Sequence, residues 1–141
     1  MKKIIFTGIA LVLGYATSFA QSKTPQIVAA KFNEKFPGVT DAKWDKENAH
    51  EYEATFNWNG AKYSANFSDK GEWLETESVF AFDQLPDKVQ KAFNISHATT
   101  TVKSVSKIET SKGMTKYEIE IKQGHKTAEL FYTSDGVKTK E

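Results

Sequence analysis

Apolar and polar side chains alternate most clearly between residues 52 and 71. The apolar positions are Tyr52, Ala54, Phe56 and Trp58 before the pair Asn59-Gly60, and Ala61, Tyr63, Ala65 and Phe67 after it. An Asn-Gly pair between two alternating runs is typical of a β-hairpin with a two-residue turn. Such a turn places Trp58 opposite Ala61 and keeps every apolar side chain on one face. A slip of one residue would expose that face, so the register is strongly specified.

Two other stretches have the spacing of amphipathic helices. In each stretch three apolar residues are spaced four positions apart near a proline. They are Val28, Phe32 and Phe36 after Pro25, and Leu85, Val89 and Phe93 around Pro86. Proline is common at the start of a helix, where its missing N–H has no intrahelical partner. The pair Pro37-Gly38 predicts the end of the first helix. Each helix has one apolar face to bury.

The remaining chain predicts further strands at residues 39–46, 72–79, 101–109 and 117–122, then at 128–132 and after Gly136. The order of helix, strands and turns in residues 25–79 recurs in residues 85–140, with Tyr117 in the place of Tyr52. The second hairpin turn, near Gly124, fits either two or four residues. We therefore predict an α+β fold, a tandem repeat of a helix plus a four-stranded antiparallel meander, with both helices on one sheet face and the opposite face open.

The first 20 residues predict a secretory signal peptide. Lys2 and Lys3 precede an apolar run over residues 4–13, and Ser18-Phe19-Ala20 offers small residues before a cut after Ala20. The run is too short to anchor the chain, because a span needs about 20 apolar residues. The mature chain, residues 21–141, is expected in the periplasm or outside the cell. It contains no cysteine, so its core must hold the fold without disulfides.

Composition excludes several classes of partner. The chain has 141 residues, enough for one domain, and its formal net charge is +1. Removal of Lys2 and Lys3 with the signal peptide leaves 17 lysines against 18 acidic residues, a net charge of about −1. A nearly neutral chain is not expected to bind nucleic acid or an anionic membrane. All its cations other than histidine are lysines, so it has no arginine fork for a carboxylate or phosphate.

Scaffold positions carry a resemblance to a known family. The positions are the secretory segment, the helices led by Pro25 and by Leu85-Pro86, and the strands that begin at Tyr52-Glu53 and Tyr117-Glu118. Over residues 25–140 they resemble the PepSY-like family of small exported bacterial proteins, also described as β-lactamase-inhibitor-like. The resemblance implies a helix-plus-sheet module, and the inhibitors it resembles grip a loop of a target enzyme with an open sheet. Those inhibitors carry disulfides, and none of their functional residues carries over to this chain.

No catalytic, metal or cofactor site is predicted. His50, His97 and His125 fall in expected turns or loops, without the spacing of metal ligands on one element. The serines lack a nucleophile motif. Carboxylates lie two residues apart on expected strands at Glu51 and Glu53, Glu75 and Glu77, and Glu118 and Glu120. A spacing of about 7 Å could serve glycoside chemistry, but we interpret these pairs as a solvated face with lysines across the strands.

Aromatic side chains outside the expected core indicate binding. Phe131 falls on the polar side of its strand, and Trp73 competes with Leu74 for the inward position. Exposed aromatics are common anchors of protein interfaces, so Phe131 and Trp73 are the candidate partner-binding residues. The leading hypothesis is an exported, non-enzymatic module that holds a protein or peptide through its open sheet face, such as an inhibitor or modulator of a peptidase or another envelope enzyme. The alternative is a periplasmic carrier of a small ligand or ion that uses Glu118 and Glu120; an enzyme ranks last.

Overall fold

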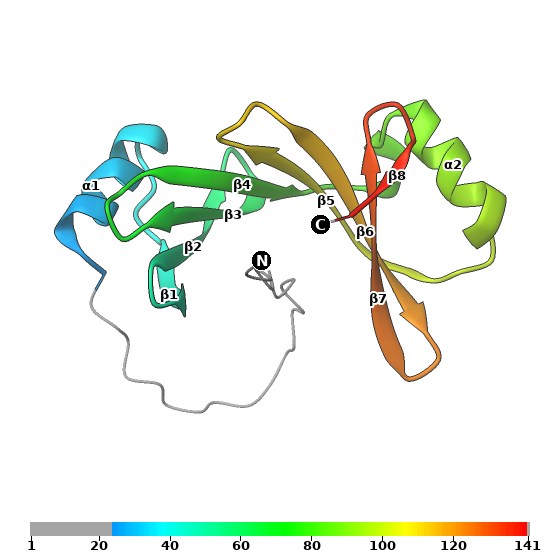
Figure 1. Ribbon diagram of the computed structural model, residues 1–141, viewed down its shortest axis with the longest axis horizontal. Helices are drawn as coiled ribbons and strands as arrows, with labels where there is room; N and C mark the ends of the chain where they lie inside the picture. Colours follow the sequence, from blue (N-terminus) through cyan, green and yellow to red (C-terminus); the bar gives the residue numbers. More distant parts are fainter. Residues whose placement is uncertain (1–23, 141) are drawn as a thin grey trace, which may run out of the picture.

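The computed structural model describes residues 24–140, so the predicted signal peptide lies outside the described residues. Eight strands form one antiparallel sheet in chain order (Figure 1). The elements are α1 (Gln26–Lys35), β1 (Lys43–Asn48), β2 (Glu51–Trp58), β3 (Ala61–Ser68), β4 (Trp73–Val79), the short 3₁₀ helix η1 (Phe82–Gln84), α2 (Asp87–His97), β5 (Val102–Thr110), β6 (Thr115–Gln123), β7 (Lys126–Thr133) and β8 (Lys138–Thr139). None of the helices in this part of the chain is both long and apolar enough to span a membrane.

The hairpin of β2 and β3 has the predicted register. Trp58 lies opposite Ala61 and Tyr52 opposite Phe67, with the pairs between them in step. Asn59 and Gly60 both have positive φ, at 51° and 81°, as the expected turn requires. The second hairpin turn, left open by the sequence, has two residues, because Gln123 pairs with Lys126.

Each helix closes a separate hydrophobic cluster. The α1 cluster contains Val28, Phe32, Phe36, Tyr52, Ala54, Phe56, Ala65 and Phe67, and Trp44, Trp58, Tyr63 and Trp73 pack against it. The α2 cluster contains Leu85, Val89, Phe93, Val105, Ile119, Ile121, Leu130 and Tyr132. Both helices begin directly after a proline and bury the predicted apolar stripe. The two clusters therefore fasten the helices near opposite ends of the sheet (Figure 1).

The register shows that both helices lie on the same face. One row of paired residues crosses the sheet from Tyr63 through Ser78, Lys107 and Tyr117 to Tyr132. Side chains in one row share a face. Tyr63 packs against the α1 cluster and Tyr132 belongs to the α2 cluster. We call this the helix face, and the other side the open face.

The predicted tandem repeat of two helix-plus-four-strand units is wrong, although the broader α+β class is correct. β4 pairs with β5 from Glu75 opposite Thr110 to Val79 opposite Ser106, so a single sheet continues across the predicted boundary. The last strand has 2 residues, whereas β4 has 7. Pairing gives the backbone groups of β4 and β5 partners that two separate sheets would leave on exposed edges. The sheet is therefore one body with two helices.

Candidate functional site: the open face of the sheet

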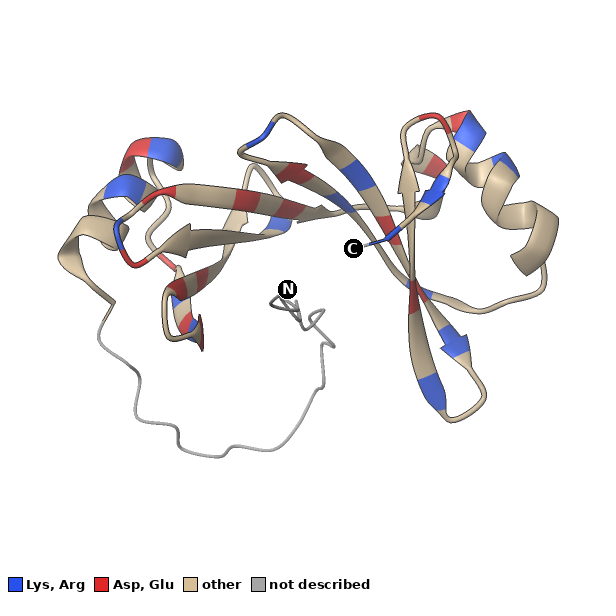
Figure 2. Ribbon diagram, in the orientation of Figure 1, with Lys and Arg blue, Asp and Glu red and all other residues tan. Residues whose placement is uncertain are grey.

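The open face carries an excess of acidic side chains. Alternation and register place there Asp45, Glu51, Glu53, Glu75, Glu77, Glu118, Glu120 and Glu129, against Lys43, Lys62, Lys116 and Lys122, and the ion pair with Glu120 adds Lys103. Figure 2 shows acidic positions along β4 and on strands around it. Because cross-strand neighbours interact at 4.5–5.5 Å, opposite charges in adjacent rows partly neutralise one another. The face as a whole keeps a negative surplus, which favours a cationic partner.

Side chains on this face are buried, although neither helix covers it. Glu53, Ser106 and Glu120 are only 5 %, 3 % and 6 % exposed. Burial raises the pKa of the Glu77 carboxyl, the hydrogen bond with Ser106 opposes the rise, and the charge of Glu129 adds to it. Such burial on a face that no helix covers indicates that the sheet curls toward this side, so that its open face is concave.

Glu53 is the most perturbed group on this face. Burial raises its pKa to about 7, and the nearby charge of Glu47 adds to the rise, while the Ser64 hydroxyl opposes it. Its Oε1 is buried without a hydrogen-bond partner. A carboxyl group with such a pKa is partly protonated at neutral pH. Burial and the neighbouring Glu47 therefore both disfavour the charged form of Glu53.

Glu120 is buried in a different environment. Lys103 Nζ donates a hydrogen bond to its Oε1 at 3.0 Å, and Ser104 Oγ donates one to its Oε2 at 2.9 Å. The register of β5 shifts between Val102 and Ser104, which brings two consecutive side chains of that strand to Glu120. Both oxygens are thus engaged. This arrangement weakens the alternative in which Glu118 and Glu120 hold a ligand or ion.

The two predicted partner-binding residues are not brought together. Phe131 lies on the open face, opposite Glu118, as alternation predicts, but it is 8 % exposed rather than an exposed anchor. Trp73 lies on the helix face, opposite Phe67, and is half-buried. The solvated interpretation of the acidic pairs is wrong for Glu53 and Glu120, which are buried. Alternation predicts which side of the sheet a residue faces, but not how exposed that side is.

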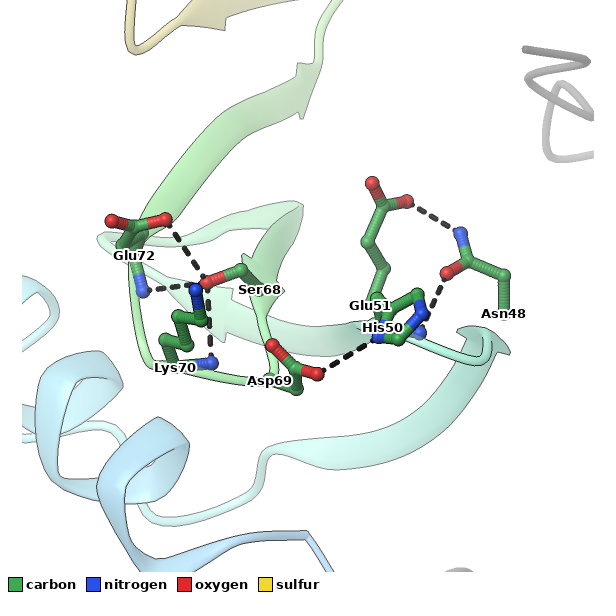
Figure 3. A network of polar contacts seen from close by, with 7 residues as sticks. All are labelled: Asn48, His50, Glu51, Ser68, Asp69, Lys70 and Glu72. Carbon is green, nitrogen blue, oxygen red and sulfur yellow. Dashed lines mark hydrogen bonds and ion pairs between the residues drawn. The ribbon is translucent and has the colours of Figure 1, made fainter. Parts of the chain in front are cut away.

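The histidines lie apart from this face. His50 contacts Asp69 at 3.0 Å between Nδ1 and Oδ2, which ties the turn after β1 to the turn after β3 (Figure 3). The hydrogen bond from His50 lowers the pKa of the Asp69 carboxyl. His97 ends α2 and stacks on Phe93, and His125 lies in the turn after β6. Within residues 24–140, no group of three or more acidic, histidine or cysteine side chains is arranged to hold a metal ion.

Comparison with known proteins places this fold. The family model described as "Putative beta-lactamase-inhibitor-like, PepSY-like" matches residues 50–139. Among solved structures, a DUF2874 family protein from Bacteroides ovatus is 27% identical, with a TM-score of 0.74 over 82% of this chain and 84% of that one. No curated protein matches the chain.

Two further solved structures share the fold at lower identity. A "putative periplasmic" protein from Bacteroides eggerthii is 19% identical, with a TM-score of 0.77 over 83% of this chain and 86% of that one. A "BLIP-like protein" from Bacteroides fragilis is 23% identical, with a TM-score of 0.70 over 82% of this chain and 83% of that one. At these identities the likeness shows the fold alone.

Proposed function

The chain belongs to the PepSY-like family, and from this membership we propose that it is an exported, non-enzymatic binding module for a protein partner. The concave, acidic open face is the observation that carries the proposal. Its shape suits a protruding segment of a partner, and its negative surplus suits a segment rich in lysine or arginine. Export rests on the predicted signal peptide and on the description of the Bacteroides eggerthii relative.

The partner class follows from the family. The family description and the Bacteroides fragilis relative both point to inhibitor-like proteins. An inhibitor of this kind would cover the active site of a peptidase or another envelope enzyme with its concave face. Phe131 would act from the floor of that face, by holding its shape beneath the contacting carboxylates, because its side chain is buried.

The buried acids give this face a reason to prefer a cation. Glu53 Oε1 has no hydrogen-bond partner, and the pKa of Glu53 is raised to about 7. An ammonium or guanidinium group placed beside Glu47 and Glu53 would stabilise both carboxylates in their charged form. Binding of a basic segment would therefore release a proton near neutral pH, and affinity should rise with pH through that range.

The test compares two charge reversals of equal size. Glu129→Lys alters the open face, and Glu34→Lys alters the solvent side of α1, where the Glu34 side chain is 65% exposed. Each variant and the unaltered mature chain would be used to capture proteins from an envelope extract, and each captured protein would be purified and titrated by calorimetry. We expect a partner that binds the unaltered chain and Glu34→Lys but binds Glu129→Lys at least ten-fold more weakly. The proposal would be contradicted if every captured partner bound Glu129→Lys as tightly as the unaltered chain, or if no partner were captured.

A further inference from the structure

A cleft on the helix face is separate from the concave site. It has a volume of about 600 Å³ and lies between the end of α1 and the turn that joins β5 to β6. One wall carries Phe36, Trp58, Tyr63 and Trp73, and the other is formed by Thr110, Ser111, Gly113, Met114 and Thr115. The C-terminal end of α1, at Lys35, borders the cleft. Its location makes it independent of the proposed protein-binding surface.

The aromatic wall is held rigid but keeps its rings partly accessible. Trp58 meets Phe36 and Tyr63 edge to face, with ring centroids 5.4 and 5.6 Å apart. Trp73 Nε1 donates a hydrogen bond to Thr76 Oγ1 at 2.9 Å. Because these contacts already fix the rings, binding of a ligand would cost little conformational entropy of these side chains. Trp58, Tyr63 and Trp73 are all half-buried, and so they offer apolar surface to a bound molecule.

The floor of the cleft is polar and nearly balanced in charge. Lys107 Nζ lies 2.8 Å from Glu109 Oε1, and Ser78 and Thr115 add hydroxyl groups. The remaining cation, Lys35, already sits 3.5 Å from the centre of the Trp73 ring. The lining therefore supplies donors and acceptors together beside an apolar wall. It supplies no unpaired cluster of one sign that would select an ion.

This lining disfavours three other occupants. A peptide strand cannot add here, because the backbone groups of β3, β4 and β5 are already paired within the sheet. An apolar helix would bury Lys107 and Glu109 away from water, at a cost that nothing offsets. A proline-rich segment presents carbonyl acceptors but few donors, so the acceptor oxygens of the floor would gain few hydrogen bonds from it.

We infer that the cleft binds a neutral oligosaccharide. A pyranose ring has an apolar face of C–H groups, which packs against the rings of Trp58, Tyr63 and Trp73. Its hydroxyl groups both donate and accept, so they match Glu109, Lys107 and the floor hydroxyls together. A neutral sugar also requires no compensating charge. This is a second binding activity, and it does not depend on the concave face.

Tryptophan fluorescence gives a direct test, because two of the three tryptophans line the cleft. The mature chain would be titrated separately with maltohexaose, cellohexaose and the hexamer of N-acetylglucosamine. We expect a saturable shift in emission with at least one of them. Trp44→Phe is the matched control, since Trp44 contacts Phe32 and Phe67 away from the cleft, and it should leave the affinity unchanged.

Two variants assign the binding to the cleft. Trp73→Ala should weaken it at least ten-fold, and Glu109→Gln, whose side chain is 51% exposed and outside the core, should weaken it several-fold without altering the fold by circular dichroism. Glu129→Lys on the open face should have no effect, which separates this inference from the proposed function. No response to any of the three sugars, equal affinity in Glu109→Gln, or tighter binding of decaproline than of the sugars would overturn it.

Discussion

Each of the two hydrophobic clusters packs a helix onto the sheet, but the two are built from different side chains. The α1 cluster joins aromatic rings in tilted and edge-to-face contacts. The ring centre of Phe32 lies within 6.1 Å of the ring centres of Phe36, Phe56 and Phe67. The α2 cluster relies on aliphatic residues such as Ile119 and Leu130. The phenylalanines of the α1 cluster are buried, but Trp58, Tyr63 and Trp73 at its edge stay partly accessible, because Trp and Tyr rings are seldom wholly buried. The comparison teaches that the α1 end is built for contact as well as for stability.

The largest expected effect lies at the centre of the aromatic cluster. Phe32→Ala should lower the free energy of unfolding by about 3–5 kcal/mol, because it leaves a cavity among rings that cannot easily move inward. Val89→Ala, on the buried side of α2, should lower it by only about 1–2 kcal/mol, since fewer carbon atoms are lost. Urea denaturation measures both. Equal losses would contradict the expectation that the larger cavity, among the aromatic rings, costs more.

A second difference concerns the turn glycines beneath the helices. Gly136, with φ +78°, faces the backbone of Lys88 in α2 so closely that a Cβ would collide with it, whereas a Cβ at Gly71 would meet Lys31 and Ile27 of α1 at 3.0–3.2 Å. Gly136→Ala should therefore lower the free energy of unfolding by about 2–4 kcal/mol, and Gly71→Ala by about 1–2 kcal/mol. Gly60→Ala has free space around it and isolates the cost of positive φ alone. Thermal unfolding of the three variants checks the order.

Acid titration should sharpen the contrast between Glu53 and Glu120. The folded chain holds the Glu53 proton more tightly than the unfolded chain does, because the pKa rises from 4.5 to about 7. Between those values the native state binds more protons, so stability falls as pH rises, by about 3 kcal/mol in total. Glu53→Gln should remove this slope in urea denaturation at a series of pH values. An unchanged slope would show that Glu53 is not the group responsible.

The control for that titration is Glu34→Gln. Glu34 is an exposed acid on α1, paired with Lys31 at 2.8 Å. Its substitution removes the same charge from the protein surface without touching the buried pair. The fall in stability between pH 4.5 and 7 should persist in this variant.

The smallest expected effects concern two surface contacts, one at each end. Asp69 receives a hydrogen bond from His50 and Asp135 from Lys88, and each contact lowers the pKa of its carboxyl. His50→Ala should return the pKa of Asp69 toward its usual range, and Lys88→Met should do the same for Asp135. Carboxyl chemical shifts measured during acid titration report both. A pKa of Asp69 that moves in Lys88→Met would contradict this local assignment.

Local patterns predicted local structure well. Alternation around Asn59-Gly60 was sufficient for the register of β2 and β3, because a two-residue turn and a one-sided apolar face leave no other pairing. The prolines at 25 and 86 marked the helix starts. These features depend on residues close together in the chain, where spacing carries the information.

Long-range features escaped the same reasoning. The pairing of β4 with β5 joins backbone groups separated by η1 and α2, and no side-chain pattern encodes it. The register shift between Asn66 and Phe67, like the one in β5, breaks strict alternation, and it explains why the place of Trp73 was ambiguous. Phe131 is buried although alternation places it on the polar side of its strand, where it pairs with Thr139 of β8. Its burial depends on contacts between strands, which the spacing along one strand does not encode.

The pairing of β4 with β5 makes one continuous layer of backbone out of the two halves of the chain. Successive residues of one strand point to opposite sides of such a layer. On β5, Lys107 and Glu109 line the cleft, while Ile108 between them belongs to the other side. Neighbouring positions of a single strand can therefore be altered to address one side of the molecule at a time.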